Sequence, residues 1–101
     1  MKVVPRKPGE LGRPADWFDQ FPAGTPSGDA PAGVRELAHV AARLRDVLET
    51  VSVSEFARRA RVDRGTIYDV LAGDVWIDTS TLARLERAAG VRLWPERFEL
   101  S

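Results

Sequence analysis

The sequence predicts an all-α fold of about five helices, preceded by an extension rich in proline and glycine. Apolar residues between positions 34 and 93 recur every three or four places, which is the spacing of one face of a helix. Residues that favour helix N-caps stand before these runs, and glycines stand directly after them. No stretch alternates between apolar and polar residues for long enough to predict a sheet. With 101 residues, the chain has room for one small domain.

Residues 1–33 form the extension, which holds six of the seven prolines and five of the eight glycines. Proline removes backbone donors and glycine raises the entropic cost of ordering, so we expect neither helix nor sheet here. Three aromatic residues, Trp17, Phe18 and Phe21, lie within five positions of one another. A solvated linker rarely carries such a cluster. The rings are therefore expected either to pack against the domain or to bind a protein partner.

Residues 34–101 form the predicted helical domain. The first helix carries an apolar stripe of about four turns, made of Leu37, Val40, Ala41, Leu44, Val47, Leu48 and Val51. Ser52 and Glu55 have the spacing of a capping box, which predicts a second helix that runs to Ala60. Asp63 is the next good N-cap, so a third helix over 64–72 follows after a turn at Arg61 and Val62.

Glycines mark the ends of the last two predicted helices. Gly73 closes the third helix, and Gly90 closes a fourth helix that begins after the cap at residues 78–80. Trp76, in the loop between them, is expected to pack in the core. An apolar tail follows the fourth helix, and its largest side chains are Leu93, Trp94, Phe98 and Leu100.

Composition excludes several classes of protein. Fifteen basic and fifteen acidic residues leave the chain formally neutral, so it is not a polycation that coats nucleic acid. The absence of cysteine and the single histidine, His39, predict no disulfide, no metal site and no other cofactor. No phosphate-binding glycine loop or nucleophile motif is present, so we do not expect an enzyme. Without a signal-peptide core or an apolar run of about 20 residues, we expect no membrane contact and a cytoplasmic location.

The second and third predicted helices have the spacing of a helix-turn-helix. Ala57 is small where the two helices cross, and Val62, Ile67 and Val70 can fill the angle between them. The outer face of the helix over 64–72 is then free. Residues 58–64 carry four arginines and one aspartate, which is a local net charge of +3 in a neutral chain.

The chain resembles the phage-repressor-like (Xre-type) helix-turn-helix family over about residues 34–93. The matching stretches are 51–60, 62–68, Gly73, 81–85 and 88–91. The resemblance implies a five-helix fold and a transcriptional regulator whose third helix enters the major groove. Arg61 stands where the family usually has a glycine in a left-handed turn, and Val53 stands where it often has a glutamine that contacts the DNA backbone.

The site residues expected from this pattern fall into two groups. The residues expected to read bases are Arg64, Gly65, Thr66 and Asp69. The residues expected to contact phosphates are Ser52, Ser54, Arg58, Arg59, Arg61 and Tyr68.

We therefore expect a regulator, acting as a repressor, that binds double-stranded DNA as a homodimer. The expected dimer interface is the apolar tail formed by Leu93, Trp94, Phe98 and Leu100, unless that tail folds over its own domain or over the N-terminal aromatic residues. The alternative hypothesis is a protein-interaction adaptor or antitoxin-like subunit that binds its partner through Trp17, Phe18 and Phe21. A chain that begins near Ala32 is expected to fold and to bind DNA.

Overall fold

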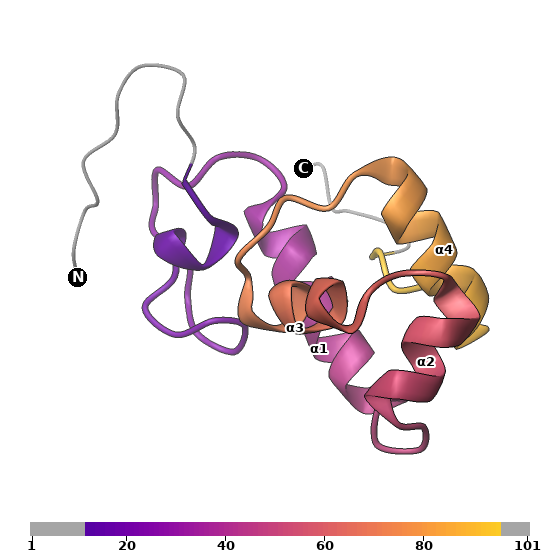
Figure 1. The fold of residues 1–101 in the computed structure, drawn as a ribbon. Helices are drawn as coiled ribbons and strands as arrows, with labels where there is room; N and C mark the ends of the chain where they lie inside the picture. Colours follow the sequence, from indigo (N-terminus) through magenta and orange to yellow (C-terminus); the bar gives the residue numbers. More distant parts are fainter. Residues whose placement is uncertain (1–11, 96–101) are drawn as a thin grey trace.

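The computed structural model describes residues 12–95, and this part of the chain is helical (Figure 1). The elements in chain order are the 3₁₀ helix η1 (Pro14–Trp17) and the α-helices α1 (Val34–Val47), α2 (Val53–Ala60), α3 (Arg64–Ala72) and α4 (Thr79–Ala89). The predicted all-α class is confirmed. The described residues contain four α-helices where the sequence led us to expect five, and their only β-type pairing is an isolated bridge between Phe18 and Pro26.

Helix α1 is the first of the predicted helices, but it ends at Val47, about one turn before the end of its apolar stripe. Thr50 closes this end, because its hydroxyl and its N–H both donate to the Val47 carbonyl at 3.1 Å. The chain then turns, yet Leu48 and Val51 still pack against the core. Apolar side chains can therefore continue a helical pattern beyond the helix itself.

Helices α2 and α3 are joined by a tight turn over residues 61–63 and pack against each other. The Ser52 hydroxyl caps α2 by accepting from the Glu55 N–H at 3.1 Å. Arg61 ends α2 with φ 62° and ψ 45°, the left-handed conformation predicted for it. The Val62 N–H then returns to the Ala57 carbonyl at 3.1 Å. Asp63 precedes α3 as predicted, although its side chain makes no capping hydrogen bond.

The core lies where α1, α2, α3 and α4 meet. Its fully or nearly fully buried cluster is Val40, Leu44, Phe56, Ala57, Ala60, Ile67, Val70, Leu85 and Leu93. None of the polar or charged side chains in residues 12–95 is buried. The position of α3 is therefore fixed on its inner side by apolar packing alone, through Ile67 and Val70.

The described part of the extension packs against one end of the helical domain, where Figure 1 shows it as violet loops beside α1 and α3. Residues 12–15, which we call the strap, run antiparallel to residues 73–76. Three hydrogen bonds join them in reverse order: Ala15 N to Gly73 O (2.9 Å), Arg13 Nη1 to Asp74 Oδ1 (2.7 Å) and Trp76 Nε1 to Gly12 O (2.7 Å). The strap therefore holds the stretch that follows α3.

No helix within residues 12–95 is long and apolar enough to cross a membrane.

Candidate nucleic-acid interface

The outer face of α3 is open to solvent. Ile67 and Val70 point into the core, whereas Arg64, Gly65, Tyr68 and Asp69 are exposed. Tyr68 is the most exposed large side chain with apolar character in the described structure, at 56%. Thr66, the remaining residue expected to read bases, is half-buried. The face predicted for base reading is thus the free face of this helix, apart from the partial burial of Thr66.

Arg64 and Ser54 come together although they lie on different helices. The Arg64 Nη1 donates to the Ser54 Oγ at 3.3 Å, which joins the first turn of α3 to the first turn of α2. Both side chains are exposed. The two first turns therefore present one continuous polar surface.

Gly65 has no structural reason to be glycine. A Cβ built at this position meets no atom within 4 Å, and its backbone is helical. Glycine in a helix costs up to about 1 kcal/mol relative to alanine. The chain therefore carries a destabilising residue at an exposed point of α3 where its own packing demands none.

The arginines of α2 share one acidic partner. Arg58 and Arg59 donate to the Glu55 carboxylate at 2.6 and 3.0 Å, and their side chains are 72% and 52% exposed. Hydrogen bonds from Arg58 and then Arg59 lower the pKa of Glu55, and the same Glu55 contact raises the pKa of Arg58. Because two guanidiniums share one carboxylate, the trio keeps a net positive charge.

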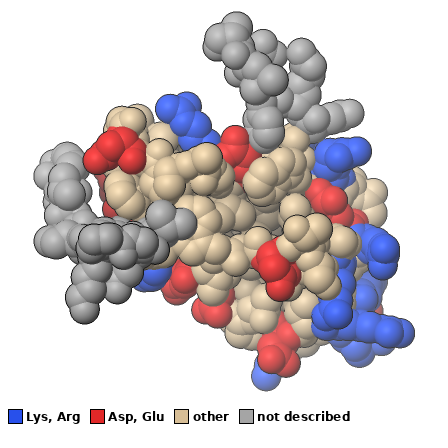
Figure 2. Space-filling model, turned by 90° about the horizontal axis from the view of Figure 1, so that it is seen from above, with Lys and Arg blue, Asp and Glu red and all other residues tan. Residues whose placement is uncertain are grey.

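Arg84 is a residue of this surface that the sequence argument missed. It is exposed on α4, and its Nη1 lies 3.5 Å from the Arg61 carbonyl in the turn between α2 and α3. A single arginine on a distant helix carries no local signal in the sequence. We define the arginine patch as the exposed residues Arg58, Arg59, Arg61, Arg64 and Arg84. Figure 2 shows basic side chains gathered at the side of the molecule where α2 and α4 lie.

Ser52 and Asp69 have surroundings that bear on their expected contacts. The Ser52 hydroxyl already accepts from the Glu55 N–H, so a contact with a phosphate would have to use the serine O–H as donor.

Asp69 is exposed and makes no ion pair with another described residue. Within residues 12–95, the Arg64 guanidinium contacts Ser54 and not Asp69.

The tail expected at a dimer interface is divided by the structure. Leu93 is fully buried in the core of its own chain, so its side chain is not on the surface. The Glu86 carboxylate fixes this position by accepting from the N–H groups of Leu93 and Trp94 at 2.8 and 2.9 Å. Trp94 is half-buried against the core. Phe98 and Leu100 lie outside the described residues.

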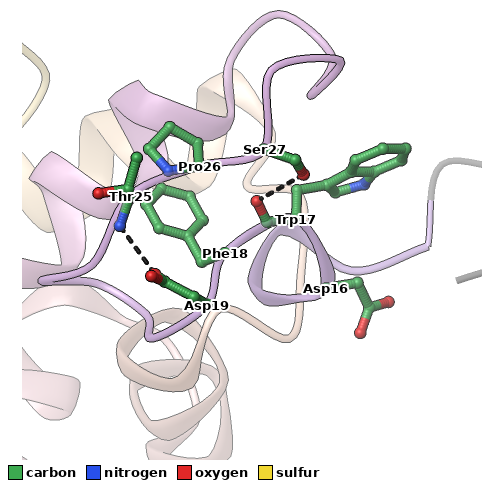
Figure 3. Close-up of a pocket in the computed structure, with 7 residues that line it drawn as sticks. All are labelled: Asp16, Trp17, Phe18, Asp19, Thr25, Pro26 and Ser27. Atoms are coloured by element: carbon green, nitrogen blue, oxygen red, sulfur yellow. Dashed lines mark hydrogen bonds between the residues drawn. The ribbon is translucent and has the colours of Figure 1, made fainter. Parts of the chain in front are cut away.

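Two aromatic residues of the extension, Phe18 and Phe21, contact each other. The Phe18 and Phe21 rings meet edge to face, with centroids 5.2 Å apart. Figure 3 shows Phe18 beside Pro26, and a hollow of about 560 Å³ is bordered by residues 16–19 and 25–27. Hydrogen bonds from Thr25 N to Asp19 Oδ1 (2.8 Å) and from Ser27 Oγ to the Trp17 carbonyl (3.1 Å) hold its two walls together. These contacts give the extension a defined shape between the two segments.

Within residues 12–95, no group of three or more histidine, aspartate or glutamate side chains is arranged to hold a metal ion. Comparison with known proteins found no matching family model, no matching curated protein and no matching solved structure. The surface of α2 and α3 is therefore the structural basis for assigning a function to this protein.

Proposed function

We propose that this protein binds double-stranded DNA in a sequence-specific manner and regulates transcription as a repressor. In this proposal α2, the turn over 61–63 and α3 act as a helix-turn-helix, and α3 enters the major groove. The observation that carries the proposal is the free face of α3, where Arg64, Gly65 and Tyr68 are exposed opposite the buried Ile67 and Val70.

The dimensions of α3 suit this role. An α-helix with its side chains is about 10–12 Å across, and the major groove of B-DNA is about 12 Å wide. Arg64 lies at the first position of α3 and is long enough to donate to O6 and N7 of guanine. Gly65 beside it would let a base edge or a thymine methyl approach the helix backbone.

The charges around α3 also support the proposal. Four further exposed arginines lie on or beside α2 and α3: Arg58, Arg59, Arg61 and Arg84. Their guanidiniums can donate to phosphates, and such contacts supply much of the affinity for DNA. The rest of the chain offsets their charge, since the whole chain is neutral. A local arginine patch on a neutral chain favours binding in one orientation over uniform coating.

The test is a selection from random DNA duplexes. The full chain is incubated with the library at low salt, and the retained duplexes are sequenced. We expect an enriched motif, which Arg64→Ala weakens at one position. The control is Arg35→Ala, since Arg35 is an exposed arginine at the start of α1, near the extension. It is expected to select the same motif as the wild type. A retained pool that matches the input library would contradict the proposal.

Protein interaction through the extension is the second candidate function. It is favoured by the hollow beside Trp17, Phe18 and Pro26, whose walls are held by hydrogen bonds. A two-hybrid screen with the full chain tests it. Partners that depend on the hollow should be lost with Phe18→Ala and kept with Arg64→Ala. Partners that are kept by both variants would contradict this candidate.

A further inference from the structure

We infer that residues 12–21 position α3 for DNA, so that sequence-specific affinity depends on a segment outside the four α-helices. This inference rests on the proposed function. It concerns residues that make no direct contact with the duplex in that proposal. Their role is to fix the end of the helix that reads the groove.

The first observation is the antiparallel pairing of the strap with residues 73–76. The hydrogen bond nearest α3 runs from the Ala15 N–H to the carbonyl of Gly73, the residue that ends α3. Asp74 and Trp76 add the next two contacts, to Arg13 and Gly12. Because η1 also packs against α1, the strap connects the end of α3 to the longest helix of the domain.

The second observation is the closeness of packing at Gly73. A Cβ built on this residue would lie 2.8 Å from the Phe21 ring and 2.9 Å from the Ala15 Cβ. Real Cβ atoms do not approach other carbons this closely, so one side would have to move. The Ala15 Cβ is attached directly to the backbone, and its displacement would move the strap itself. Gly73 is therefore a point of close contact between the extension and the end of α3.

The third observation is how α3 is held elsewhere. At its first turn, Arg64 donates to Ser54, and on its inner side Ile67 and Val70 are buried. Among the described residues, the strap and Phe21 contact the end of α3 at Gly73. A helix held at one end can change its angle while its buried face stays in place. A small change of angle moves base-reading side chains out of register with the bases, because such contacts need accurate geometry.

The chain offers a matched control for this inference. Gly73 and Gly90 both end a helix, and both have φ 72°. An alanine at either position has the same unfavourable backbone conformation. At Gly90, however, the new Cβ meets no atom within 4 Å. The difference between Gly73→Ala and Gly90→Ala therefore isolates the contact with Ala15 and Phe21.

The experiment measures binding of the full chain to the selected duplex and to an unrelated duplex, at a temperature where circular dichroism shows each variant folded. We expect Gly73→Ala to weaken binding to the selected duplex at least tenfold more than Gly90→Ala does. Binding to the unrelated duplex should change less than twofold, because the arginine patch is intact. This ratio separates positioning from a general loss of structure.

Phe21→Ala is a second variant, which keeps the test decisive if Gly73→Ala does not fold. It removes the ring that packs on Gly73, and the same loss of discrimination is expected. A double variant with both changes should lose less than the two single losses combined, because the removed ring makes room for the new Cβ. We also expect a chain that begins near Ala32 to lose discrimination, which revises the expectation from the sequence.

The outcomes distinguish the two proposals. If the wild type selects no duplex, the proposed function fails and the positioning role fails with it. If the wild type selects a motif and both Gly73→Ala and Phe21→Ala discriminate as well as Gly90→Ala, only the positioning role is wrong.

Discussion

The guanidinium of Arg64 donates to the hydroxyl of Ser54 at 3.3 Å, across the turn between α2 and α3. A serine hydroxyl can accept this hydrogen bond and still donate its own proton. The contact is therefore compatible with both roles proposed for the pair. Ser54 can donate to a phosphate while it orients Arg64 toward the base edges.

The first prediction compares arginines within the patch. Arg64→Ala should weaken specific binding by about 1–3 kcal/mol and relax the preference at one base position. Arg58→Ala or Arg59→Ala should weaken binding to all sequences alike and lower the salt slope by about one for each lost phosphate contact. Fluorescence anisotropy with the selected duplex and its single-base variants, at several salt concentrations, measures both effects. Equal losses on all duplexes for the three variants would remove Arg64 from base reading.

The second prediction concerns Gly65. Gly65→Ala should raise the free energy of unfolding by up to about 1 kcal/mol, because alanine favours the helix and its Cβ meets no neighbour. The same change should weaken specific binding, since the Cβ would stand between the helix and a close base. Urea unfolding and anisotropy give the two numbers. A variant that is more stable and binds equally well would show that no base approaches Gly65.

The third prediction concerns the left-handed conformation of Arg61. Arg61→Gly should raise the free energy of unfolding by about 1 kcal/mol relative to Arg61→Ala, because glycine adopts positive φ without strain. Both variants lose the same charge, so both should lower the salt slope of DNA binding equally. Thermal unfolding and anisotropy of the pair separate the backbone effect from the charge effect. Equal stability of the two variants would contradict the strain at this turn.

The fourth prediction concerns stability at low pH. Hydrogen bonds from Arg58 and Arg59 lower the pKa of Glu55, and hydrogen bonds from Thr81 lower the pKa of Asp78. Each carboxylate therefore stabilises the folded chain above its ordinary pKa, and this contribution is lost as the pH falls through the lowered value. Stability should decrease between about pH 5 and pH 3. Glu55→Gln should flatten part of this decrease, and urea titrations at a series of pH values measure it. If Glu55→Gln has the same pH profile of stability as the wild type, the ion pairs of Glu55 with Arg58 and Arg59 do not stabilise the fold.

The fifth prediction concerns the homodimer. Two-fold pairing is the usual way for a single helix-turn-helix to reach useful affinity, and it would place two reading helices about 34 Å apart. With Leu93 buried, the surface available after α4 includes the half-exposed Val91 and the edge of Trp94. Sedimentation should give a dimer for the full chain and a monomer for the Trp94→Ala, Phe98→Ala double variant. A monomeric wild type at tens of micromolar protein would contradict the dimer.

Local signals in the sequence predicted much of the helical domain. Ser52 and Asp78 cap their helices, and Gly73 and Gly90 end theirs. Each of these features depends on residues within about four positions of one another, so the sequence carries it directly. The outer face of α3 could be predicted in the same way. Helix periodicity places Ile67 and Val70 together on the inner face, so the residues between them lie on the outer face.

Contacts between distant segments could not be predicted in this way. The pairing of Ala15 with Gly73 and the contact of Arg84 with the Arg61 carbonyl join residues that share no local pattern. The burial of Leu93 depends on Glu86, whose carboxylate fixes the chain after α4. From the sequence we expected the whole tail to be exposed apolar surface, because no local pattern indicates that Leu93 completes the core.

The position of the tryptophans determines which parts of the chain fluorescence would report. Phe56 is the aromatic ring of the buried cluster, whereas Trp17 belongs to η1 and the Trp76 indole donates to Gly12 at the strap. The emission of Trp17 and Trp76 therefore reports on the edge of the domain, whereas that of Trp94 reports on the side of the core. Far-ultraviolet circular dichroism follows the helices. Coincident unfolding curves would mean that strap and helices melt as one cooperative unit. An earlier change in emission would identify the strap as a separate, weaker unit of the native state.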